Sequence, residues 1–138
     1  MALIGRLHPL IVHFPIALAI IGTLAESGAW LTHDRRWRFV AFANVRFGAL
    51  FSVAAAFAGW RLAVAPNDST QLLEWHRWFG VCAAAAMTAA ALATVNDDGQ
   101  SIVAERVYRA ALLSATVFVI VTAHLGGVLV WGADFLRP

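Results

Sequence analysis

Leu7 to Pro15 reads LHPLIVHFP and opens an apolar segment that we expect to form a helix over residues 9–31. Its two histidines and two prolines are unusual there, because ionisable side chains are rare inside membrane-spanning helices and usually serve a function. Pro15 has no backbone N–H, so it leaves the carbonyl of Ile11 without its helical partner and favours a kink. The stretch therefore predicts a kinked helix that carries a site.

The composition of the whole chain indicates a membrane protein. Of its 138 residues, 61% are hydrophobic and only 13% are charged, and the mean hydropathy is +0.73. Further apolar segments follow at 39–63, 72–95 and 103–131, and each is about the 20 residues that a helix needs to cross a hydrocarbon core. Because short connectors make successive helices antiparallel, we expect one all-α domain over 1–138, an integral membrane up-down-up-down four-helix bundle.

The charged residues exclude one class of partner and suggest an orientation. All ten basic residues are arginines placed near the ends of apolar segments, so no continuous basic face is available for nucleic acid. Six arginines flank the end marked by Trp30 and Trp37, and four flank the other end, which predicts that the first end is cytoplasmic. Within that end, Glu26 and Arg46 come at similar depth, and we expect them to form an intramembrane ion pair.

Four of the five histidines are expected at the opposite, outer end. Alternating helix directions bring together the start of the first segment, the start of the third and the end of the fourth, which carry His8, His13, His76 and His124. At about 1.5 Å of rise per residue, His124 lies roughly 10 Å inside Trp131. His8 precedes a proline and is expected at the rim, whereas His33 belongs to the cytoplasmic turn.

Buried neutral imidazoles between helices suit two kinds of cofactor, axial ligation of a haem iron or a copper or zinc ion held by several nitrogens. Hydrogen-bonded packing of each histidine, with no cofactor, is the third interpretation. His13, His76 and His124 are the candidate ligands. Diagonal helices favour His13 with His76 and matched depth favours His13 with His124, so the pair stays open.

The surroundings favour haem over a small metal site. Gly80, Gly126 and Gly127 lie close in sequence to the candidate ligands and could leave room for a porphyrin. Arg61 and Arg77 lie near the same end and could pair with its propionates. The single cysteine, Cys82, falls within an apolar segment, so neither an internal disulfide nor a covalent haem attachment motif is present.

Three ordered motifs resemble a bacterial family of four-span membrane proteins, the domain of unknown function twenty-two thirty-one. They are LHP with VHFPIA in the first segment, HRWFG opening the third and TAHLGGVLVWG closing the fourth. The resemblance implies a multi-pass protein of the bacterial inner membrane and, because the family is sometimes fused to cytochrome c-like modules, redox work. Family members often have Tyr in place of Trp131 and a further His after the final glycine, where this chain has Ala133 and Asp134.

These features together predict a membrane-embedded subunit that binds haem b and passes electrons within a larger respiratory or photosynthetic complex, with its termini in the periplasm. Its expected partners are membrane lipid and other subunits of a redox complex. No nucleophile motif, phosphate-binding loop or catalytic carboxylate pair is present, so we do not expect an enzyme in isolation. The alternatives are an assembly subunit without a cofactor and a copper or zinc site.

Overall fold

Each predicted apolar segment forms a long helix in the computed structural model of the protein, which describes residues 5–62, 70–95 and 101–134. Within these ranges the chain is all-helical, with no strand. The short helix α2 precedes the four long ones: α2 (His8–Ile11), α3 (His13–Thr32), α4 (Arg35–Leu62), α5 (Gln71–Ala93) and α6 (Ile102–Trp131). The predicted connector at 96–100, that at 65–70 apart from Thr70, and Arg137 lie outside the described residues.

Polar side chains define where several of these helices begin. Thr70 and Ser101 cap α5 and α6, their hydroxyls accepting hydrogen bonds from the backbone N–H groups of Leu73 and Ala104 at 3.3 and 3.2 Å. His33 ends α3 in the left-handed conformation, with φ at 57°, and Asp34 then accepts a bond from the N–H of Arg36 at 2.8 Å. Only these two residues join α3 to α4, so the two helices must turn back on each other.

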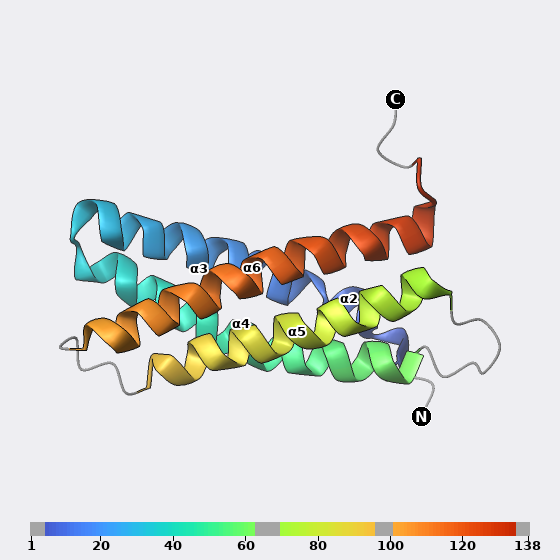
Figure 1. The fold of residues 1–138 in the computed structure, drawn as a ribbon, viewed down its shortest axis with the longest axis horizontal. Helices are drawn as coiled ribbons and strands as arrows, with labels where there is room; N and C mark the ends of the chain where they lie inside the picture. The colour runs from blue at the N-terminus through green and yellow to red at the C-terminus, as the bar shows by residue number, and fades with distance from the viewer. Residues whose placement is uncertain (1–4, 63–69, 96–100, 135–138) are drawn as a thin grey trace.

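The first apolar segment is interrupted one turn before Pro15, where the sequence predicts a kink. Helix α2 ends at Ile11 and α3 begins at His13, with Val12 in the turn between them. The proline ring removes the hydrogen bond that the carbonyl of Ile11 would accept, and it crowds that carbonyl. The interruption leaves α2 packed on α4 as well as on α3, and Figure 1 shows the two stretches of helix as separate pieces.

The long helices lie side by side, and each packs on the next one in the chain, while α6 closes the ring against α3. Successive helices run in opposite directions along the long axis (Figure 1). Helices α3 and α5 consequently lie on a diagonal, as do α4 and α6. One end of the bundle therefore gathers α2, the end of α4, the start of α5 and the end of α6.

The core between the helices is built mainly from small side chains. The residues buried there are Ala19, Ala49, Ala83, Ala90 and Ala115, together with Val45, Met87, Tyr108, Leu112 and Val119. Small residues let helix backbones approach closely, which strengthens van der Waals packing in lipid. Met87 fills the remaining space, and a Cβ placed on Gly48 would lie 3.4 Å from its terminal methyl group.

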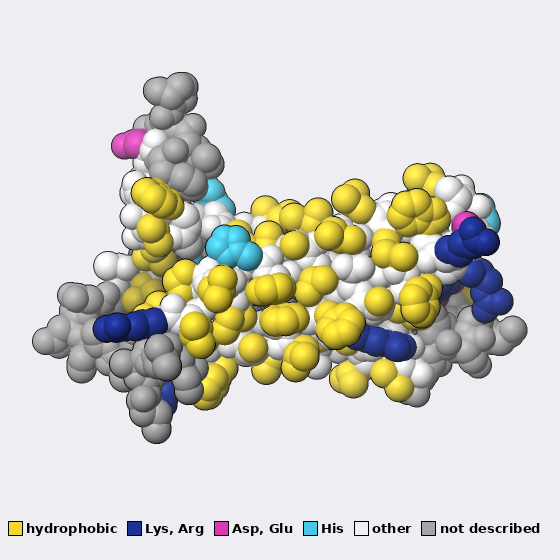
Figure 2. Space-filling view, turned by 180° about the vertical axis from the view of Figure 1, so that it is seen from behind, with side chains coloured by type: hydrophobic (Ala, Val, Ile, Leu, Met, Phe, Trp, Pro, Cys, Tyr) yellow, Lys and Arg dark blue, Asp and Glu magenta, His cyan; other side chains and the backbone are white. Residues whose placement is uncertain are grey.

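The outer surface is apolar along the middle of the bundle and basic at both ends (Figure 2). Large side chains such as Leu24, Leu50 and Val117 are more than half exposed there. Three helical stretches in the described chain are long and apolar enough to cross a membrane: His8–Thr32, Arg35–Leu62 and Ile102–Trp131. Helix α5, whose first two turns carry Glu74, His76 and Arg77, is not among them. An apolar belt of this kind places the helices in contact with lipid.

Neighbouring leucines on α6 provide a test of this packing. Leu112 is 1% exposed, whereas Leu113 is 57% exposed. Leu112→Ala is expected to lower the free energy of unfolding by about 2 to 5 kcal/mol, because it leaves a cavity between helices. Leu113→Ala, the matched control, removes the same atoms from the outer face and should cost less than about 1 kcal/mol. Unfolding in mixed detergent measures both, and equal losses would contradict the burial.

Candidate functional site

Two histidines meet at the end of the bundle that gathers α2, α4, α5 and α6. The ring centroids of His8 and His76 are 6.1 Å apart, and the ring planes are nearly perpendicular, at 89°. His8 is the first residue of α2, and His76 lies in the second turn of α5. The break at Val12 separates α2 from α3, so the first histidine packs on α4 and approaches α5.

Each imidazole is held by a backbone carbonyl of the helix beside it. His8 Nδ1 lies 2.9 Å from the carbonyl oxygen of Ala55 on α4, and His76 Nδ1 lies 3.0 Å from that of Thr122 on α6. A carbonyl oxygen only accepts, so Nδ1 carries the proton in both rings. In the neutral form, Nε2 of each ring is then left with a lone pair, which is the form in which histidine binds metals.

A glycine one turn after each carbonyl makes room for the ring. A Cβ added to Gly59, four residues after Ala55, would lie 2.7 Å from His8 Cε1. A Cβ added to Gly126, four residues after Thr122, would lie 3.1 Å from His76 Cε1. The two halves of the bundle thus repeat one arrangement, in which a histidine of α2 or α5 sits in a glycine notch of α4 or α6.

The remaining candidate residues are distributed around this pair. His13 and His124 are exposed, whereas the sequence predicts both as ligands buried between helices. Gly80 has only an ordinary contact, because a Cβ added there would lie 3.6 Å from the Thr122 methyl group, and Gly127 is half-buried. Figure 2 shows histidine side chains reaching the surface toward this end.

Arginine and tryptophan border the histidine pair. The Arg77 guanidinium lies 4.7 Å from the centroid of the Trp60 ring, and Trp60 packs edge-on against Trp78 at 5.9 Å. Arg61 is exposed at the end of α4. Among the described residues, no group of three or more His, Cys, Asp or Glu side chains lies close enough to hold a metal ion. The described part of this end therefore brings together two imidazole rings, those of His8 and His76, as possible metal ligands.

The sequence interpretation did not single out Gly59. The sequence nevertheless contains a repeat that indicates this glycine. His8 precedes Ala55 by 47 residues, and His76 precedes Thr122 by 46. A glycine follows four residues after Ala55 and after Thr122. Comparing the two halves of the chain would have aligned Gly59 with Gly126. The histidine–glycine relation is visible only as a repeat between distant segments, since nothing in the local sequence of α4 indicates it.

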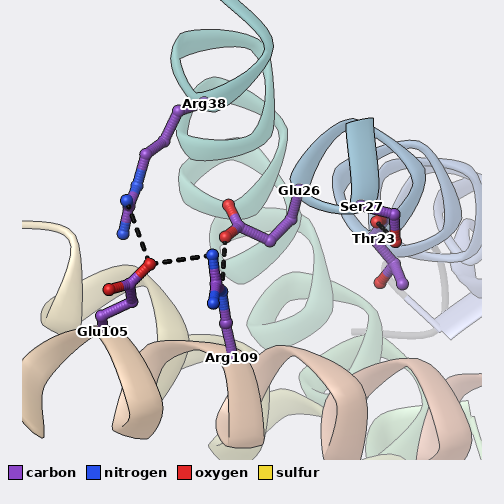
Figure 3. Close-up of polar contacts among 6 residues, drawn as sticks. All are labelled: Thr23, Glu26, Ser27, Arg38, Glu105 and Arg109. Carbon is purple, nitrogen blue, oxygen red and sulfur yellow. Dashed lines mark hydrogen bonds and ion pairs between the residues drawn. The ribbon is translucent and has the colours of Figure 1, made fainter. Parts of the chain in front are cut away.

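A second polar cluster occupies the opposite end, and its pairing corrects the sequence prediction. Arg109 Nε on α6, not Arg46, lies 2.9 Å from Glu26 Oε1. Arg46 instead donates to the hydroxyl and the carbonyl of Thr94 at 2.9 and 3.0 Å, at the end of α5. Glu105 joins the cluster by accepting from Arg109 at 2.8 Å (Figure 3).

The fold and its apolar surface define the class of the molecule: an all-helical membrane protein with paired polar groups at both ends. Comparison of the sequence with family models then identifies the family. The model described as "Predicted membrane protein (DUF2231)" matches residues 6–135, so the chain belongs to that family. Searches of curated proteins and of solved structures found no significant match.

The glycine notches can be tested by adding one methyl group. Gly59→Ala is expected to displace the His8 ring and weaken its bond to Ala55, at a cost of about 1 to 3 kcal/mol in the free energy of unfolding. Gly80→Ala is the matched control on another helix of the same end, and it should be neutral or slightly stabilising because alanine favours the helix.

Two measurements check this prediction: detergent unfolding and the ¹⁵N chemical shifts of the His8 ring. Gly59→Ala should change both, while Gly80→Ala should leave the His8 shifts in place. A Gly59→Ala protein with wild-type stability and unchanged His8 shifts would contradict the notch.

Proposed function

We propose that the protein is a membrane-embedded electron-transfer subunit in which His8 and His76 are the axial ligands of one b-type haem. The observation that carries the proposal is the 6.1 Å separation of the two ring centroids. Two imidazoles bound on opposite sides of one metal ion, with bonds near 2 Å, have ring centroids roughly 6 Å apart. The pair therefore has the spacing that a shared iron requires.

The hydrogen bonds of the two rings support a ligand role. Metal-binding histidines usually donate the other ring N–H to a carbonyl or carboxylate, which fixes the tautomer and the ring orientation. His8 and His76 do this toward Ala55 and Thr122 on two different helices. With Nδ1–H engaged in this way, Nε2 of each ring would be the atom that binds the metal, and neither ring would have to change its tautomer.

The chain's own residues would hold and shield the group. Haem, when bound, supplies reversible one-electron chemistry at its iron. Arg77 and Arg61, at the ends of α5 and α4 that border the histidines, are the candidates to pair with its propionates. The Arg77 guanidinium lies over the Trp60 ring, which packs edge-on against Trp78, so these indoles would border the group.

The proposed topology has four membrane spans, because α5, with 23 residues, is long enough to cross and packs antiparallel to α4 and α6. Its polar first turns, with Glu74, His76 and Arg77, would lie toward the membrane surface beside the histidine site. The bias of arginines toward the other end puts that end in the cytoplasm and both termini in the periplasm of a bacterial inner membrane. The partners are other subunits of a redox complex, and the chain is not an enzyme in isolation.

A second candidate function, an assembly subunit without a cofactor, is favoured by the same hydrogen bonds. Each imidazole is already bound across helices, and interhelical hydrogen bonds of this kind stabilise membrane bundles. A copper or zinc ion could occupy the same two nitrogens with further ligands from a partner. These candidates differ from the first in what the purified protein contains.

The experiment is an absorption spectrum of the purified protein, with haem extraction and elemental analysis. We expect a Soret band and stoichiometric iron in the wild type. His8→Ala and His76→Ala should each abolish the band, because each removes one axial ligand. His13→Ala and His124→Ala are matched controls at exposed positions, and their spectra should equal that of the wild type.

The other outcomes each count against the proposal. A protein without haem or iron, even after expression with added haem, would favour the assembly subunit. Stoichiometric copper or zinc would favour the small-metal site. Loss of the Soret band in His13→Ala, with the band of His8→Ala unchanged, would show that the ligand is His13 on α3 and not His8 on α2.

A further inference from the structure

A cavity of about 200 Å³ lies between α3 and α6 at the end of the bundle opposite the histidine pair. Glu26, Ser27 and Trp30 line it from α3, and Arg109 and Leu113 line it from α6. Trp30 and Leu113 are 62% and 57% exposed on the apolar outer surface. The cavity therefore opens sideways toward lipid, and a ligand can enter it from the bilayer.

The charges around the cavity cancel. The side chain of Arg109 contacts Glu26 and Glu105 at 2.9 and 2.8 Å, and Glu105 also accepts from Arg38 at 3.3 Å. Figure 3 shows this chain of contacts running from α4 through α6 to α3. Two carboxylates thus balance two guanidinium groups. An anion placed beside Arg109 would meet both carboxylates, whereas a neutral polar group would avoid that repulsion.

The polar atoms at the wall suit a neutral carbonyl or hydroxyl compound. The Arg109 side chain is 32% exposed, so its guanidinium can donate to a carbonyl oxygen. The exposed Ser27 hydroxyl donates to the carbonyl of Thr23 at 2.9 Å, which leaves its oxygen as an acceptor. The Trp30 indole supplies an aromatic wall, and aromatic rings pack well in offset or edge-on contact.

We propose that this cavity binds the headgroup of a lipid-soluble quinone. The carbonyl of the quinone ring would accept a hydrogen bond from Arg109. In the reduced form, a hydroxyl of the ring would donate to Ser27. The flat face of the ring would pack on Trp30. The isoprenoid tail remains in the bilayer beside the apolar surfaces of α3 and α6. A phospholipid headgroup fits less well, because its phosphate would approach Glu26 and Glu105. The proposal concerns binding and does not depend on the haem site.

Equilibrium dialysis of the detergent-solubilised full chain against a short-chain ubiquinone and a short-chain menaquinone tests the proposal. We expect one equivalent of quinone to bind saturably. Leu113→Trp fills the cavity and should weaken binding at least about tenfold. Val117→Trp is the matched control, because Val117 lies one turn further along α6, is 58% exposed and does not line the cavity. Its affinity should equal that of the wild type.

Two further measurements separate the possible outcomes. His76→Ala should bind quinone like the wild type, so failure of the haem proposal leaves this one standing. Trp30→Phe should reduce the quinone-dependent quenching of tryptophan fluorescence. Binding no greater than partition into detergent, equal binding by Leu113→Trp, or displacement of quinone by added phosphatidylglycerol would each overturn the proposal.

Discussion

A polar group surrounded by lipid must find its partner inside the protein, and this constraint shapes most of the structure. Hydroxyls inside the helices return to carbonyls one turn earlier, as Thr88, Thr116 and Thr122 do. Arg46 reaches the end of α5, where carbonyls have no helical partner. The histidines and the carboxylates follow the same rule across helices, so each polar contact also fixes the position of one helix against another.

The two ends of the bundle use this rule differently. At one end, two imidazole rings are each held by a backbone carbonyl of another helix. At the other end, four charged side chains form a chain of ion pairs from Arg38 to Glu26, and their charges cancel. The first arrangement fixes two rings against neighbouring helices, and the second creates a neutral polar wall beside lipid. The small-residue core between them holds both ends at a fixed distance.

The histidine end also shows how one local solution is used twice. His8 lies just before the hairpin of α3 and α4, and His76 lies in the second turn of the hairpin of α5 and α6. Each packs against a carbonyl and a glycine on the second long helix of its hairpin. A side chain in place of either glycine would meet the ring, so the notch and the histidine belong together. This correspondence relates the halves of the chain more clearly than their sequences do.

The sequence by itself determined the helices and the ends at which their polar residues lie. Apolar length gave segments whose bounds agree with α3 to α6 to within a few residues, and Pro15 predicted the interruption at Val12. The fixed rise per residue also put Glu26 and Arg46 at the same end of the bundle, because depth follows from position along a helix.

Only the tertiary structure decided which side chains face one another. Rotation of a helix about its axis depends on how all its neighbours pack, and a sequence gives depth without that angle. His13 therefore lies on the outer face, while His8, on the separate helix α2, reaches His76. Arg46 was expected to pair with Glu26, but α3 packs on α6, and Arg109 of α6 forms the ion pair instead.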